Sequence, residues 1–277
     1  KTAFALSMAR NMAIEHGKKV AIFSLEMSAV QLVNRLIVSE TEIAGDKIKN
    51  GRLSTQEWSL LETRIKALTE ASIFIDDTPA VSVFELRAKC RRLKAQNKLD
   101  IVIVDYLQLM TGPPDSGSRE QEVSSISRSL KGVAKELEVP VLSLSQLNRS
   151  VETRSGNKKP MLSDLRESGA IEQDADMVVF IHRPEKMGIQ MDEEGQSTKG
   201  LAEIILAKNR NGPTDEVILR FREERAMFVE PDDFEESDAV TGGPGGVYTL
   251  GSKMNDDISS NFSDFSFNNN ITPPPFD

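Results

Sequence analysis

LDIVIVDYLQLM, residues 99–110, contains four consecutive β-branched apolar residues, Ile101 to Val104, and Asp105 follows them directly. Such a run predicts a strand that is buried on both faces. In open α/β sheets, ligands bind at the carboxyl ends of the strands, which is where Asp105 falls. Asp105 is therefore a candidate ligand for a magnesium ion that carries nucleotide phosphates. The alternative is that it caps the loop that follows.

Apolar runs of the same kind recur along the chain, at 19–24, 72–77, 139–145 and 175–183. They alternate with longer segments of helical periodicity, which predicts βαβ units and an α/β fold with a mainly parallel central sheet flanked by helices. Residues 201–221 predict a C-terminal β-hairpin, with its turn at Asn211-Gly212-Pro213.

Serine residues mark the predicted starts of two of the helices. Ser54 with Glu57 forms a capping-box pattern, and Ser82 with Glu85 forms another. A polar segment without periodicity lies further along the chain and predicts loops with one short helix near 163–168.

The composition of the 277 residues indicates a globular protein with ample apolar content for a core. The single cysteine, Cys90, excludes an internal disulfide framework and indicates a reducing, cytoplasmic setting, with Cys90 as an ordinary helix residue. The apolar runs are all much shorter than the roughly 20 residues of a membrane span, and the sequence shows no signal-like segment. We therefore expect neither secretion nor a membrane partner.

The net charge of −9 is unevenly distributed. Residues 231–277 contain nine acidic residues and one basic residue, and so carry eight of the nine net negative charges. Because residues 1–230 are nearly neutral, a local basic groove for nucleic acid remains possible there. The last segment is rich in Gly, Ser, Asn, Asp and Pro, which predicts a disordered acidic tail over 231–277 after a folded domain over 1–230.

Lys1 and Thr2 open a helix rich in small residues, as the last two residues of a phosphate-binding loop do. In that loop the lysine reaches the β and γ phosphates and the hydroxyl binds magnesium. Together with Asp105, this pair predicts the two halves of a nucleotide and Mg²⁺ site. The chain enters this helix without a preceding strand or cap, so we expect it to start inside a domain, after the glycines of the loop.

Glu26 and Gln146 follow two other predicted strands and point to the same edge of the sheet. Glu26 is a candidate general base that orients the water attacking the γ-phosphate, or else an acidic residue that stabilises the start of the next helix. Gln146 is a candidate sensor of the γ-phosphate through its amide, or else an ordinary turn residue. The residues alone leave these alternatives open.

Six motifs then occur in a characteristic order: SLEMS (24–28), DDTP (76–79), VDYLQLM (104–110), SQLNRSVETR (145–154), LSDLRESGAIEQDAD (162–176) and AKNRNGP (207–213). Together they resemble the C-terminal motor domain of DnaB-type replicative helicases, which is a RecA-like P-loop ATPase. The resemblance covers about residues 1–230 and implies that this segment is the motor domain.

The resemblance also implies roles for individual residues. Lys1 and Thr2 match the end of the phosphate-binding loop, with Thr2 and Asp105 organising Mg²⁺. Glu26 matches the catalytic glutamate, and Gln146 matches the switch that reports the nucleotide state to the DNA loops.

Two further motifs are matched to contacts outside the subunit's own nucleotide site. Lys208 and Arg210 match the pair that contacts the γ-phosphate of the neighbouring subunit, where a cation stabilises charge in the transition state. DLRESG resembles the loop that lines the central channel, so Arg166, Glu167 and Gly169 are the expected single-strand contacts. Weaker candidates for DNA contact are Arg149, Arg154, Lys158 and Lys159.

The function implied is that of a hexameric helicase that hydrolyses ATP with Mg²⁺, moves 5′ to 3′ on single-stranded DNA and unwinds duplex DNA at the replication fork. Its partners in the primosome would include primase and a helicase loader, bound through an N-terminal region or the ring. Two competing interpretations are a RecA-like recombinase and a non-catalytic RecA-like ATP-binding module. The motifs KNRNGP and DLRESG favour the helicase, and the complete set of hydrolysis residues argues against the module.

Overall fold

The computed structural model describes residues 1–112, 117–154, 158–165, 169–191 and 195–231. By its contacts the chain divides into two units, Lys1–Ser237 and Asp238–Asp277, and all described residues belong to the first. The predicted tail therefore lies outside the described residues from position 232 onward.

The predicted parallel sheet is present as four strands in the order β2-β1-β3-β4. Its strands are β1 (Val20–Ser24), β2 (Ile73–Asp76), β3 (Ile101–Asp105) and β4 (Val141–Ser143). All three strand pairs are parallel. Every residue of β1 is buried, as are four of the five residues of β3, which confirms that these runs are strands covered on both faces.

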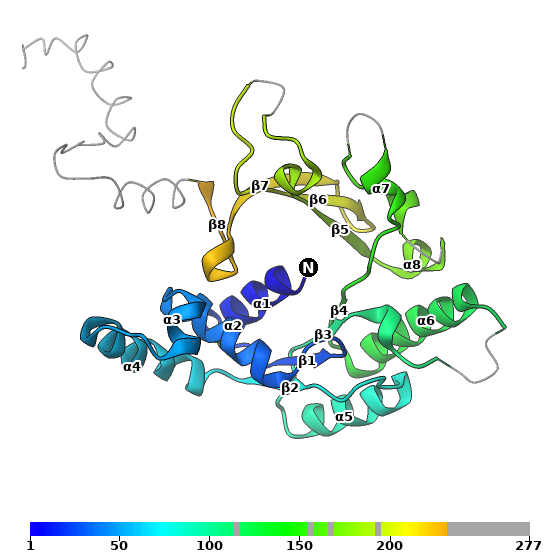
Figure 1. Ribbon diagram of the computed structural model, residues 1–277. Coiled ribbons are helices and arrows are strands. Elements are labelled where there is room, and N and C mark those ends of the chain that lie inside the picture. Colours follow the sequence, from blue (N-terminus) through cyan, green and yellow to red (C-terminus); the bar gives the residue numbers. More distant parts are fainter. Residues whose placement is uncertain (113–116, 155–157, 166–168, 192–194, 232–277) are drawn as a thin grey trace, which may run out of the picture. The chain divides into compact units, whose positions relative to one another are not determined.

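Helices cover both faces of this sheet (Figure 1). Ala21 and Phe23 of β1 pack with residues of α5 (Val83–Ala95) and α6 (Arg119–Leu137). Val20 and Ile22 point the other way and pack with residues of α1 (Thr2–Arg10) and α2 (Ala29–Thr41). The two-residue period of the strand thus divides its apolar side chains between two cores.

The helix starts follow the predicted capping chemistry. Ser54 and Glu57 form a complete capping box at the start of α4 (Thr55–Glu70), and the Ser82 side chain accepts a hydrogen bond from the Glu85 N–H. The first helix ends in a π-helical turn, η1 (Asn11–Glu15), before Gly17, which adopts a φ of +59°.

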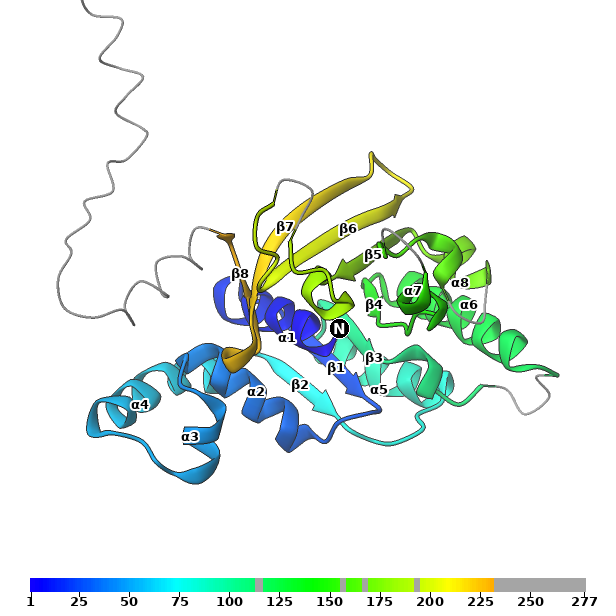
Figure 2. The ribbon, with the colours of Figure 1, turned by 45° about the horizontal axis from the view of Figure 1, so that its top comes forward.

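A second sheet of four strands is antiparallel throughout, in the order β5-β6-β7-β8 (Figure 2). Its strands are β5 (Met177–His182), β6 (Leu201–Asn209), β7 (Asp215–Arg222) and β8 (Met227–Val229). The hairpin predicted over 201–221 is confirmed as β6 and β7. The prediction of a mainly parallel central sheet is confirmed by β1 to β4, whereas β5 pairs antiparallel to β6 and belongs to the sheet of the hairpin.

The remaining elements are short. They are α3 (Gly45–Asn50), η2 (Leu107–Leu109), α7 (Ser150–Thr153), η3 (Leu162–Asp164), α8 (Gly169–Asp174), η4 (Pro184–Met187) and η5 (Glu223–Arg225). The short helix expected near 163–168 corresponds to the single 3₁₀ turn η3, followed by α8, and the residues between them lie outside the described ranges.

Aromatic residues connect β7 and β8 with the helices of the parallel sheet. Phe228 packs edge-on against Phe4 of α1, with ring centroids 5.2 Å apart, and also contacts Phe221 at 4.7 Å. Nearby, the Arg225 guanidinium forms an ion pair of 2.6 Å with Glu42, which follows α2. The helix that begins with Thr2 is therefore held from both sides.

Cys90 is fully buried in α5, and burial raises the pKa of its thiol to about 12. This agrees with its interpretation as an ordinary helix residue. None of the helices in the described ranges is long and apolar enough to cross a membrane.

Candidate active site

The parallel register places the ends of β1 and β3 side by side, with Ser24 paired to Asp105. The Leu25 N–H donates to the Asp105 carbonyl at 2.7 Å, which continues the pairing beyond the strand. The Ser24 hydroxyl, which is buried, donates to the Met27 carbonyl at 2.8 Å and so shapes the turn in SLEMS. Backbone pairing thus brings the segment that carries Glu26 next to Asp105.

Thr2 and Asp105, which are 103 residues apart in the sequence, form a direct hydrogen bond. The Thr2 hydroxyl donates to Asp105 Oδ2 at 2.7 Å. The Asp105 side chain is almost fully buried, and its Oδ1 has no hydrogen-bond partner among the described residues. A buried carboxylate oxygen without a partner beside a threonine hydroxyl fits a Mg²⁺ ion, which binds hard oxygen ligands directly or through water.

Lys1 lies beside the same carboxylate. Its ammonium group is 4.8 Å from the centroid of the Tyr106 ring. Desolvation lowers the pKa of the Lys1 side chain, and the charges of Asp105 and Glu26 raise it in part. The Thr2–Asp105 hydrogen bond, the contact of Lys1 with Tyr106 and the pairing of β1 with β3 place Lys1, Thr2, Asp105 and the segment of Glu26 at one edge of the sheet.

Gln146 is hydrogen-bonded to Gln108, a residue that the sequence analysis did not name as a site candidate. The Gln146 N–H donates to Gln108 Oε1 at 3.3 Å, and Gln108 Nε2 donates to the Ser145 hydroxyl at 2.8 Å. Gln108 belongs to the motif VDYLQLM, so its position only three residues after Asp105 was the available signal. Its amide connects the loop after β3 with the loop after β4.

The two acidic residues of DDTP have structural partners. Asp77 Oδ2 accepts a hydrogen bond of 2.8 Å from the Ala29 N–H in the first turn of α2, and this bond holds the end of the SLEMS loop. Asp76 pairs with Lys89 of α5 at 2.8 Å. The first contact ties the residue after β2 to the start of α2, and the second ties the end of β2 to α5.

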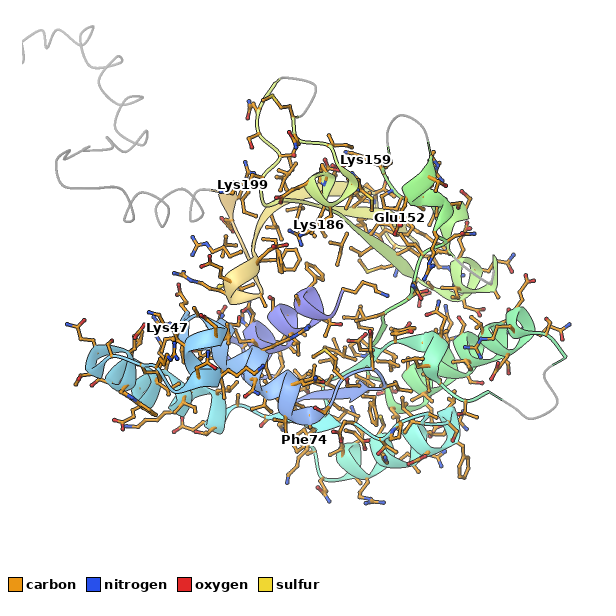
Figure 3. The ribbon with its side chains drawn as sticks, in the orientation of Figure 1. Lys47, Phe74, Glu152, Lys159, Lys186 and Lys199 are labelled. Carbon is orange, nitrogen blue, oxygen red and sulfur yellow. The ribbon has the colours of Figure 1, made fainter. Side chains whose placement is uncertain are left out.

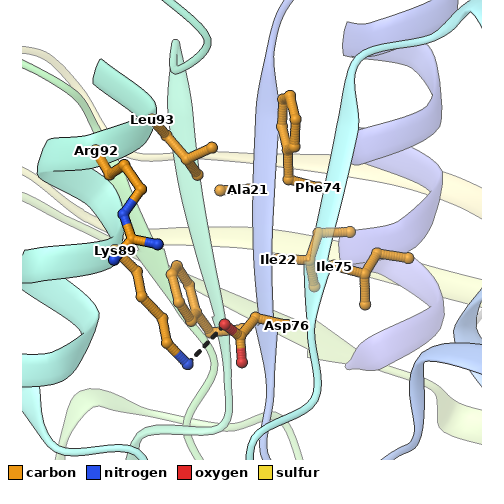
Figure 4. Close-up of a pocket in the computed structure, with 9 residues that line it drawn as sticks. Ala21, Ile22, Phe74, Ile75, Asp76, Lys89, Arg92 and Leu93 are labelled. Atoms are coloured by element: carbon orange, nitrogen blue, oxygen red, sulfur yellow. Dashed lines mark ion pairs between the residues drawn. The ribbon is translucent and has the colours of Figure 1, made fainter. Parts of the chain in front are cut away.

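A cavity of about 180 Å³ opens between β1, β2 and α5, and Asp76 and Lys89 lie at its side (Figure 4). It is lined mainly by apolar side chains, including Phe74 and Leu93. Because β2 lies on the opposite side of β1 from β3, the cavity is separate from Asp105. Its one carboxylate, Asp76, is paired with Lys89, and none of the predicted site residues lines it.

A second feature without a sequence signal is the stack of Arg183 on Phe221. The guanidinium carbon lies 4.4 Å from the ring centroid. Phe221 also contacts Phe228, which packs on Phe4 in the first turn of α1. This stack of two flat groups is therefore close to the start of α1.

Lys208 and Arg210 are not part of the Lys1–Asp105 cluster. The Lys208 ammonium donates to the Glu172 carbonyl, and the Arg210 guanidinium donates to the Gln173 carbonyl. Arg210 also reaches Asp176 Oδ1 at 3.2 Å. The pair thus contacts the end of α8 in its own chain, which leaves its predicted contact with another subunit a prediction.

The expected DNA contacts are only partly described. Arg166 and Glu167 lie outside the described residues, and Gly169 is the first residue of α8. Their role stays a prediction.

Three of the weaker basic candidates are engaged within the chain. The Lys159 ammonium pairs with Glu203 at 2.9 Å and with Glu216 at 2.8 Å, and Figure 3 shows it beside the antiparallel sheet. Arg154 forms an ion pair with Asp164, and the Lys158 ammonium donates to a backbone carbonyl at 3.2 Å. These side chains stabilise the loops that they lie in, which argues against a solvated basic groove at this place.

Comparisons with known proteins can be set against this geometry. The sequence model of the family described as "DnaB-like helicase C terminal domain" matches residues 1–230. Over 230 residues the chain is 50% identical to "Replicative DNA helicase DnaB" of Geobacillus stearothermophilus and 49% identical to "Replicative DNA helicase DnaC" of Bacillus subtilis (strain 168). Each match covers 83% of this chain and 49% of the relative, so the chain spans about half the length of these curated relatives.

Solved structures match over the same extent. One is described as "The Structure Of A DnaB-Like Replicative Helicase And Its Interactions With Primase"; it has a TM-score of 0.76 at 40% identity and covers 82% of this chain and 54% of that chain. An ATPase domain of known structure has a TM-score of 0.77 at 41% identity, covering 83% of this chain and 80% of its own. The fold is that of these RecA-like ATPase domains. Since the motifs, the fold and the family match all agree, the chain belongs to the DnaB-like helicase C-terminal domain family.

Proposed function

We propose that the protein carrying this chain is a replicative DNA helicase that hydrolyses ATP, moves 5′ to 3′ on single-stranded DNA as a homo-hexameric ring and unwinds duplex DNA at the fork. The observation that carries the proposal is the Thr2–Asp105 hydrogen bond of 2.7 Å, with the free Oδ1 of Asp105 and the Lys1 ammonium beside it. This is the constellation that a nucleoside triphosphate with Mg²⁺ requires.

In this proposal Thr2 and Asp105 hold Mg²⁺, and Lys1 contacts the β and γ phosphates. A bound Mg²⁺ supplies positive charge to the phosphate oxygens as negative charge develops on them. The charge on the phosphates would also favour the protonated form of Lys1, whose desolvation otherwise disfavours it. The Arg183–Phe221 stack near Lys1 offers a flat surface for the nucleobase.

Glu26 acts as the general base that orients the attacking water. Its exposed position after β1, whose last residue is paired with Asp105, supports this role. Gln146 responds to the γ-phosphate, and its link through Gln108 carries that response to the loop after β3.

The proposal also includes contacts between subunits and with DNA. Lys208 and Arg210 reach the γ-phosphate bound by the neighbouring subunit, and Arg166, Glu167 and Gly169 contact the backbone of single-stranded DNA without reading its bases. Residues 1–230 form the motor domain, and residues 231–277 form an acidic segment after it. We further propose contacts with primase and a helicase loader and a cytoplasmic location; one structural relative is described in terms of its interactions with primase.

The test is unwinding of a forked DNA duplex by the full-length protein, followed together with ATP hydrolysis. We expect unwinding that depends on ATP, and Glu26→Gln should keep nucleotide binding but lose hydrolysis by at least about a hundredfold. A recombinase would hydrolyse ATP without unwinding the fork, and a non-catalytic module would bind ATP without turnover.

Mixed rings test the role of Arg210 in the same assay. If Arg210 acts on the neighbouring subunit, Arg210→Ala subunits should reduce activity by more than their fraction in the mixture. A loss of activity in simple proportion to that fraction would reject the contact across subunits.

A further inference from the structure

The last turn of α8 accepts hydrogen bonds from three cations. The carbonyls of Glu172, Gln173 and Asp174 accept from Lys208, Arg210 and Lys131 respectively, the last at 2.7 Å. Carbonyls at a helix C-terminus have no partner within the helix and carry partial negative charge, so they attract cations. Three successive carbonyls with one cation each form a dense and specific arrangement for a helix of six residues.

Asp176 adds a full negative charge next to this turn. Its Oδ1 accepts from the Lys131 ammonium at 2.7 Å and from the Arg210 guanidinium at 3.2 Å, and its backbone carbonyl accepts from the Arg210 N–H at 2.9 Å. The pKa of Asp176 is lowered, first by the hydrogen bond from Lys131 and to a smaller extent by the charge of Arg210. Asp176 is thus shared between a cation from α6 and a cation from the β6–β7 turn.

The two cations differ in how firmly they are held. The Lys131 side chain is 24% exposed and donates to both the Asp174 carbonyl and Asp176, whereas Arg210 is 45% exposed and makes the longer contact with Asp176. A guanidinium also binds a phosphate through two parallel hydrogen bonds, which a single carboxylate oxygen cannot match. Arg210 is therefore the cation that can leave, and Lys131 is the one that stays to neutralise Asp176.

The position of α8 connects the release of Arg210 with the segment that is expected to contact DNA. Its first residue, Gly169, directly follows residues 166–168, and Ile171 anchors the helix in the core beside α6. The segment expected to contact DNA and the contact with Arg210 are thus at opposite ends of one short helix. A change in the contacts at the C-terminal end can act on the N-terminal end without any further element.

We propose that the α8 dock, defined as the carbonyls of Glu172–Asp174 together with Asp176, binds Lys208 and Arg210 in competition with a γ-phosphate. Asp176 and Lys131 are then positioning residues, and departure of the pair from the dock frees the helix that leads to the DNA-contacting segment. This inference rests on the proposed function of Lys208 and Arg210 and adds the site in their own subunit that they leave.

The inference predicts effects of opposite sign for two substitutions. Asp176→Asn weakens the dock, so that Arg210 is more available and hydrolysis without DNA rises about two- to fivefold, the range that exposed ion pairs support. Lys131→Met leaves Asp176 to pair with Arg210 alone, so the same rate falls by about two- to fivefold. Lys135→Met, one turn further along α6, removes the same charge without a hydrogen bond to Asp176 and should change the rate less than either.

The measurement is steady-state ATP hydrolysis by the full-length ring, with and without single-stranded DNA. We expect Asp176→Asn to raise the rate without DNA and to lower the stimulation by DNA. A role of Asp176 in folding alone would lower both rates together, and that result, or a shift of Asp176→Asn and Lys131→Met in the same direction, overturns the proposal.

Amide hydrogen exchange of residues 169–176 provides a second measurement that needs no substitution of Lys131 or Asp176. In wild-type rings, exchange should be faster with a non-hydrolysable ATP analogue than with ADP, and Arg210→Ala should make it fast with both. Equal exchange in the two nucleotide states of the wild type overturns the dock. Because this measurement requires nucleotide binding but no turnover, it is separate from the Glu26→Gln test of the proposed function.

Discussion

The parallel and the antiparallel sheet of this chain are stabilised in different ways. All of β1 and most of β3 are buried between helices, whereas Val217 and Ile218 of β7 are 53% and 51% exposed. The antiparallel sheet instead carries charged side chains, such as Glu203 on β6 and Glu216 on β7, which both pair with Lys159. The first sheet depends on apolar burial, and the second depends more on pairing and ion pairs.

This difference determines which sheet holds candidate functional side chains in fixed positions. In the parallel sheet, each apolar residue has one correct face, so the residue after the last apolar position is fixed at the strand end. Thr2, Asp105 and Glu26 gather there. In the antiparallel sheet, the functional candidate Lys208 lies near the end of β6 and Arg210 lies in the turn between β6 and β7.

The largest expected effect is on the rate of ATP hydrolysis, and it compares a carboxylate at the end of a parallel strand with one at the start of an antiparallel strand. Asp105→Asn keeps an acceptor for Thr2 but removes the charge that we assign to Mg²⁺, so ATP hydrolysis should fall by about a hundredfold or more. Asp215→Asn, at the exposed start of β7, should leave hydrolysis within about twofold. Steady-state hydrolysis at several Mg²⁺ concentrations checks both; similar losses for the two variants would remove the distinction between the sheets.

The next effect concerns stability. Ile103 is 1% exposed in the centre of β3, and Ile103→Ala should lower the free energy of unfolding by about 2–5 kcal/mol because it leaves a cavity between the sheet and the helices α1 and α2. Val217→Ala in β7 should cost about 0.5 kcal/mol or less. Urea unfolding of both variants measures the difference, and comparable costs would show that the antiparallel sheet is buried by something further in solution.

The smallest expected effect is a dependence of the free energy of unfolding on pH, which arises from a histidine of the antiparallel sheet. His182 of β5 is 2% exposed, and its Nδ1 has no hydrogen-bond partner within the described part of the chain. Desolvation lowers its pKa below 6.5, partly offset by Glu203. The unfolded chain therefore binds the proton first as the pH falls below about 6.5, and the folded state loses about 1.4 kcal/mol for each unit by which the pKa is lowered.

Unfolding measured from pH 7.5 to pH 5 tests this expectation. His182→Gln should flatten the part of the profile just below pH 6.5, and His16→Gln, at an exposed position, serves as the control. Parallel profiles for wild type and His182→Gln would indicate that the imidazole is solvated in the folded state.

Much of the parallel half could be predicted because its signals are local. Buried strands, capping boxes and the residue that follows each strand are all properties of short stretches, and the pairing of Thr2 with Asp105 follows once both stand at the same edge. The direction of β5 could not be predicted this way, because its apolar run has the same pattern as a parallel strand.

The contacts that sequence reasoning missed join distant positions through partners without a pattern of their own. Arg154 and Lys159 belong to a basic stretch, and only the fold shows that Asp164, Glu203 and Glu216 neutralise them. The acceptors of Lys208 and Arg210 are mostly backbone carbonyls, which every residue possesses. Such contacts become visible only when the chain has been placed in three dimensions.

The register between Ser24 and Asp105 has a consequence for how this sequence can change length. Inserting or deleting one residue within Ile101–Val104 would turn every following side chain to the opposite face, pushing Asp105 into a core and an apolar residue out to the strand end. Relatives of this chain should therefore keep the length of β3 unchanged.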